Sequence, residues 1–167
     1  FGFLQGTFFS FMTVGAAVFE QHFDIGQVGF GVIWGLMALT YVAGSMMIPR
    51  LARLYGELSI TQWAVMALVA TGLSGVYIQY KFGINMFTVL APLGGLMFLS
   101  GALTPAAMLG AVNSFPEVSA TASGVSSSFG LIIGGSFAVL SGTIYAYGYL
   151  YISLLSAIAT ICVGLSW

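Results

Sequence analysis

The chain has six apolar segments, and no charged residue lies inside any of them. Charged residues separate the first five segments, and a neutral connection near Ile144 separates the fifth from the sixth. The segments cover residues 1–19, 28–49, 58–80, 84–114, 118–143 and 145–167. Each is close to or longer than the roughly 20 residues that cross the hydrocarbon core of a bilayer as a helix. None alternates apolar and polar residues as the strands of a membrane barrel do. The pattern predicts an all-α integral membrane protein, in which residues 1–167 form one bundle of six transmembrane helices.

The composition excludes most soluble classes of protein. Hydrophobic residues make up 59% of the chain and charged residues 4%, whereas soluble domains carry about 25% charged residues. The net charge of -1 argues against a nucleic-acid partner, because binding phosphates needs clustered Lys and Arg. The single Cys162 excludes an intramolecular disulfide and a cysteine-based metal site. We expect the lipid bilayer as a partner and no cofactor.

The few basic residues predict an orientation. Arg50 and Arg53 lie in one connection and Lys81 lies on the opposite side of the membrane. The positive-inside rule then places residues 50–57 and both chain ends in the cytoplasm. Because the chain starts at Phe1 with no basic segment ahead of the first apolar run, we expect this run to be a span rather than a signal peptide. We also expect upstream sequence to be missing.

The two halves of the chain, residues 1–80 and 84–167, hold three apolar segments each. Their middle segments start alike. Phe23-Asp24 precedes Gly31-Val32 in the first half, and Phe115-Pro116-Glu117 precedes Gly124-Val125 in the second. A 3+3 repeat inverted in the membrane would produce this pattern, and so would the general similarity of membrane helices.

No residue of the chain is predicted to be catalytic. Ionisable side chains within the membrane mark proton relays and ion sites, and the apolar segments hold none. His22, flanked by Glu20 and Asp24, belongs to the one cluster of this kind. We expect it to lie in a solvated polar loop rather than at a metal or acid–base site. The sequence therefore argues against an enzyme and predicts no metal site.

Glycines with GxxxG spacing predict close helix packing. Gly2 and Gly6 form such a pair, as do Gly130 and Gly134. The spacing stacks small residues on one helical face, so that two backbones can approach closely. We assign Gly124, Gly130 and Gly134 to helix packing. Ordinary packing within the bundle and sliding between elements that move are both compatible with the spacing.

A few polar and aromatic residues predict a binding cavity. Phe9 and Met12 follow Gln5 at i+4 and i+7 on the face of the first helix, and the second segment contributes Trp34. Ligand pockets are mostly apolar with few polar groups, and methionine supplies adaptable contact area. We predict that Gln5, Phe9, Met12 and Trp34 bind a small-molecule substrate. The alternative is an interhelical hydrogen bond from Gln5 and aromatic side chains that face the core or the lipid.

Two stretches resemble motifs of the major facilitator superfamily. Residues 44–56, GSMMIPRLARLYG, resemble the second-half copy of its cytoplasmic loop motif, with Pro49 where the first-half copy has an acidic residue. Residues 115–124, FPEVSATASG, are similar to the F-P-x-x-x-G-T-A-S stretch of bicyclomycin-resistance-type drug/proton antiporters, with Ala120 in place of a glycine. The order of helices and motifs resembles the C-terminal six helices of that family over essentially the whole chain.

The resemblance implies half of a secondary active transporter that works by alternating access. It implies a missing N-terminal six-helix half that carries the proton-coupling carboxylate, and proton-coupled export of small hydrophobic or amphipathic molecules across a bacterial inner membrane. It also implies a cytoplasmic gate formed by Gly44, Arg50, Arg53 and Gly56.

Two other interpretations of the sequence remain open. The chain could be a self-sufficient six-helix carrier or channel whose partner is a second copy. It could also be a membrane scaffold subunit that transports nothing.

Overall fold

The chain folds into six long helices, as its sequence predicts. The computed structural model describes residues 1–114 and 116–166, and this part contains no strand. Each of the six helices is long and apolar enough to cross a membrane. Phe115 of the second motif and Trp167 of the last predicted segment lie outside the described residues. The helices are α1 (Gly2–Phe23), α2 (Gln27–Tyr55), α3 (Glu57–Phe82), α4 (Met86–Ser114), α5 (Ser119–Ile144) and α6 (Tyr149–Ser166).

The helices extend through charged residues that the sequence analysis places in connections. Glu20 and His22 belong to the end of α1, and Arg50 and Arg53 belong to α2. The prediction that His22 lies in a loop is therefore wrong, and its Nδ1 atom is 3.3 Å from the carbonyl oxygen of Val18 within the helix. A charged residue marks the end of an apolar segment but not the end of a helix. The backbone hydrogen bonds of a helix are internal, and its polar side chains can reach solvent.

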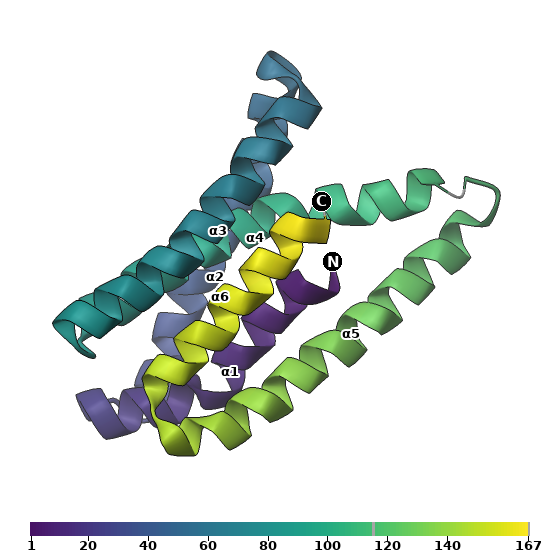
Figure 1. The fold of residues 1–167 in the computed structure, drawn as a ribbon. Coiled ribbons are helices and arrows are strands. Elements are labelled where there is room, and N and C mark those ends of the chain that lie inside the picture. Colours follow the sequence, from purple (N-terminus) through teal and green to yellow (C-terminus); the bar gives the residue numbers. More distant parts are fainter. Residues whose placement is uncertain (115, 167) are drawn as a thin grey trace.

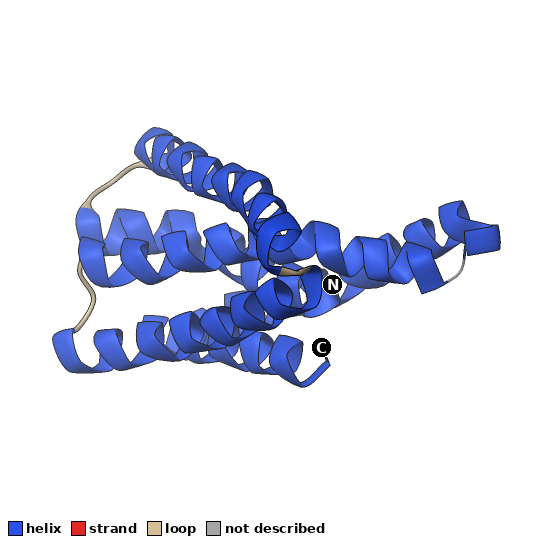
Figure 2. Ribbon diagram, turned by 90° about the horizontal axis from the view of Figure 1, so that it is seen from above, coloured by secondary structure: helices blue, strands red, loops and turns tan. Residues whose placement is uncertain are grey.

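The link between α2 and α3 is one residue long. Gly56 ends α2 and precedes α3 with a φ of 93°, a backbone region that glycine enters without strain. Its N–H donates to the carbonyl of Ala52 at 2.9 Å. The connection predicted over residues 50–57 thus contracts to a tight hairpin. Figure 2 shows helices throughout, joined by short loops.

The two most extensive helix contacts join helices that are not consecutive in the sequence. α1 packs most extensively on α5, α2 on α4, and α3 on α4 and α6. Both chain ends lie at the same end of the bundle, between the α2–α3 and α4–α5 hairpins (Figure 1). α4 and α1 are the most buried helices, whereas α2 and α5 are the least buried.

Glycines allow close contact at the α2–α4 and α1–α5 crossings. Between α2 and α4, an added Cβ on Gly44 would overlap the carbonyl oxygen of Phe98, and one on Gly101 would overlap that of Tyr41. Each overlap is with backbone and is shorter than real Cβ contacts. The two backbones are therefore in direct contact.

The α1–α5 crossing uses two of the glycines assigned to helix packing. Gly130 lies against the ring of Phe1, and an added Cβ on Gly134 would lie 2.6 Å from the ring of Phe9. Gly124 is exposed, and a Cβ there would meet nothing within 4 Å in the described part of the chain. It takes no part in this crossing.

Candidate binding cavity between α1, α2 and α4

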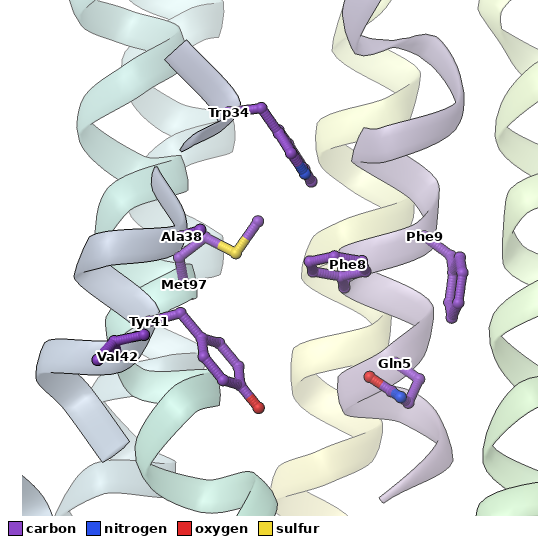
Figure 3. A pocket seen from close by; sticks show the side chains of 8 residues that line it. All are labelled: Gln5, Phe8, Phe9, Trp34, Ala38, Tyr41, Val42 and Met97. Atoms are coloured by element: carbon purple, nitrogen blue, oxygen red, sulfur yellow. The ribbon is translucent and has the colours of Figure 1, made fainter. Parts of the chain in front are cut away.

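A cavity of about 360 Å³ lies between three helices near the N-terminal end of α1. Figure 3 shows its walls, with α2 on one side and α1 on the other. Met97 of α4 is buried and lies deep in the cavity, whereas Ala38 and Val42 of α2 are exposed and form its rim. The lining residues are Gln5, Phe8, Phe9, Trp34, Ala38, Tyr41, Val42 and Met97.

An aromatic ladder fills the space between α1 and α2 from the cavity toward the turn that joins them. The ring of Phe8 lies 5.5 Å from that of Trp34, and Trp34 lies 5.7 Å from Phe30. Phe30 lies in turn 5.7 Å from Phe19. Centroid separations of 4.5–7 Å are those at which aromatic pairs attract. Gly15 makes room for the ladder, because an added Cβ there would lie 2.7 Å from the Phe30 ring.

The glycine crossing between α2 and α4 forms the opposite wall. Gly101 contacts the backbone carbonyl of Tyr41, whose side chain lines the cavity. Met97 lies one helical turn before Gly101 on α4. The close approach of the two backbones therefore presents Met97 to the space beside α2. The cavity is the volume left where α1 makes few contacts with α2 and α2 is held against α4 instead.

The chemistry of the wall is apolar, with two polar groups. The amide of Gln5 and the hydroxyl of Tyr41 are both directed into the space between α1 and α2 (Figure 3). None of the lining residues is charged. Such a surface binds a ligand through its apolar area and orients it with one or two hydrogen bonds. It holds no acid, base or nucleophile pair for catalysis.

The structure brings together three of the four residues predicted to bind substrate. Gln5, Phe9 and Trp34 line the cavity, although the Phe9 ring lies on the side of α1 away from α2 (Figure 3). Met12 does not line it and is 48% exposed. Seven residues of helix place Met12 about 10 Å beyond Gln5, past the contact between Phe8 and Trp34.

The sequence analysis did not assign the other five lining residues to the site. A signal exists for Ala38 and Tyr41, which follow Trp34 at i+4 and i+7 on one face of α2. Phe8 adjoins Phe9 but points to a different side of α1 (Figure 3). Nothing in the local pattern around Met97 connects it with α1 or α2. That proximity arises from the helix crossing alone.

The residues assigned to a gate are spread along α2. Gly44 is buried at the α4 crossing and Gly56 forms the link to α3. Arg50 and Arg53 are exposed near the end of α2. Their role in gating stays a prediction.

No family model, curated protein or solved structure matches the chain. The two motif stretches therefore remain a resemblance.

Proposed function

We propose that this chain is one six-helix half of a secondary active transporter and that the cavity between α1, α2 and α4 binds the substrate. The observation that carries the proposal is an uncharged cavity of about 360 Å³ among helices able to span a membrane. Its aromatic wall fits a small hydrophobic or amphipathic molecule. Gln5 and Tyr41 supply the polar contacts that such a molecule needs for orientation.

The packing of the helices supports an inverted 3+3 repeat. α1 packs on α5 as α4 packs on α2, and α3 packs on α4 as α6 packs on α1. If α1, α2 and α3 correspond to α4, α5 and α6 in that order, the two contacts in each comparison are equivalent. Transporters built from such repeats hold their substrates near the repeat interface. In such a repeat the cavity lies at the interface, because α1 and α2 come from the first set of helices and α4 from the second.

The distribution of charge and exposure supports alternating access against a second bundle. α2 and α5 are the least buried helices, and their exposed faces would meet that bundle. Proton coupling needs an ionisable group within the membrane, and the apolar segments of this chain hold no Asp or Glu. The coupling carboxylate therefore belongs to the second bundle. The resemblance to drug/proton antiporters adds export across a bacterial inner membrane to the proposal.

Export of an aromatic dye from cells tests the cavity. Trp34→Ala removes the ring between Phe8 and Phe30, and we expect a roughly tenfold rise in the dye concentration for half-maximal export, about 1.4 kcal/mol. Gln5→Ala changes the order of preference among several dyes, because it removes a polar contact. The measurement is ethidium or rhodamine efflux followed by fluorescence at graded dye concentrations.

Trp63→Ala is the matched control for the tryptophan substitution. Trp63 lies on α3 and is 68% exposed, so its loss leaves the cavity intact and export unchanged. Equal export by the wild type and both cavity variants would remove the cavity from the transport path. Transport by a symmetric dimer of this chain alone would favour the homodimeric carrier, and export no faster than from cells lacking the protein would favour the scaffold.

A further inference from the structure

A buried polar cluster, separate from the larger cavity, joins α3, α4 and α6. Gln79 of α3, Thr88 of α4, and Ser153 and Ser156 of α6 are each at most 8% exposed. Buried polar groups need hydrogen-bond partners, because their contacts with water are lost.

The amide of Gln79 bonds to both neighbouring helices. Pro92 has no N–H, so within α4 the carbonyl of Thr88 lacks its partner four residues later. The Nε2 atom of Gln79 donates to this carbonyl at 3.2 Å. Ser153 Oγ donates to Gln79 Oε1. Gln79 thus satisfies the carbonyl that Pro92 leaves free and holds α6 through the same side chain.

A small cavity of about 20 Å³ adjoins this amide. Gly72 and Gly75 of α3 form part of its wall, together with Pro92 and the side chains of Ser153 and Ser156. The Ser156 hydroxyl is buried and has no hydrogen-bond partner among the described residues. An unpartnered hydroxyl and an amide thus border the same space.

We propose that one water molecule binds in this cavity and bridges the Ser156 hydroxyl to the amide of Gln79. A space that admits a water-sized probe needs about 10–15 Å³ to hold one water, which also needs two to four polar partners. The cavity meets the volume, and Gln79, Ser153 and Ser156 supply the partners. A cation fits poorly, because the lining residues carry no charge to balance it.

The bound water completes the polar cluster. It gives the Ser156 hydroxyl a partner and offers Gln79 an additional one beside the Pro92 position. This inference is independent of the proposed transport function, because it rests on α3, α4 and α6 and not on the larger cavity.

X-ray radiolysis of the protein in lipid nanodiscs tests the site, because hydroxyl radicals formed from a bound water label the side chains beside it. Phe11, Leu93 and Leu96 line the small cavity. We expect them to be labelled at least about fivefold faster than Leu4 and Leu103, which are as deeply buried and lie outside it. Labelling is read by mass spectrometry after exposures of milliseconds.

Ser156→Val should displace the water, because it removes the hydroxyl and fills the space. We expect labelling of Phe11 and Leu93 to fall to the level of Leu103, while Ser136→Val on the exposed face of α5 changes nothing. Equal labelling of Phe11, Leu93 and Leu103 in the wild-type protein would overturn the proposal. The wild-type comparison decides the question even if Ser156→Val does not fold.

Discussion

Gly101→Ala is expected to lower the free energy of unfolding by about 1–3 kcal/mol, the range typical of overpacked cores. The added Cβ would overlap the carbonyl oxygen of Tyr41, and a backbone oxygen cannot move aside as a side chain can. α2 and α4 would have to separate, which would also move Tyr41 and Met97 in the cavity wall. The measurement is equilibrium unfolding in mixed micelles, with dye affinity as a second readout.

Gly94→Ala is the matched control, because Gly94 lies two turns before Gly101 on the same face of α4. A Cβ on Gly94 would meet only the Met37 sulfur, at an ordinary 3.7 Å. Alanine is favoured over glycine in a helix by about 1 kcal/mol, so this variant is expected to be as stable as the wild type or more so. Equal stability of the two alanine variants would contradict the backbone contact between α2 and α4.

Gln79→Leu is expected to lower the free energy of unfolding by a similar 1–3 kcal/mol. The substitution leaves the Thr88 carbonyl buried without its donor, and an unsatisfied buried group costs about that much. Ser153 loses its acceptor as well, although a serine in a helix can turn to a carbonyl of its own helix. Gln62→Leu is the control, since Gln62 is exposed on the same helix.

A double-mutant cycle with Pro92→Ala isolates the cause of that loss. Alanine at position 92 restores an N–H that can bond the Thr88 carbonyl within α4. Gln79→Leu should therefore cost less in the Pro92→Ala background than in the wild type, with a coupling of about 1 kcal/mol. Strict additivity of the two substitutions would show that Gln79 does not replace the bond missing at Pro92.

The architecture follows closely from sequence, but the helix boundaries do not. The six apolar segments predict six helices, because a chain that crosses a lipid bilayer can adopt few structures other than a helix. The charges of Glu20 and Arg53 predict connections, yet both residues belong to helices, which continue past the apolar segment where side chains reach solvent. Hydropathy locates the hydrocarbon core, and helix ends depend on residues such as Gly56.

The sequence likewise predicts part of the candidate site and misses the rest. Gln5 and Trp34 could be selected in advance, because a lone amide and a large aromatic are conspicuous in apolar helices. Met12 lies on the same face of α1 as Gln5, but it lies beyond the end of the cavity. The helical period predicts which face a side chain occupies, but it does not predict how far along that face the cavity extends. Met97 enters from α4, and no short-range pattern relates it to α1.

The sequence by itself determined that this chain forms long apolar helices able to span a membrane, and that its apolar segments hold no charged residue. Composition and spacing suffice for both conclusions, because they concern each segment alone. Only the tertiary structure decided which helices meet. The contact of Gly44 and Gly101 with opposing carbonyls, and the bond from Gln79 to Thr88, join residues whose local sequences say nothing of each other. The cavity and the polar cluster both arise from those contacts between helices.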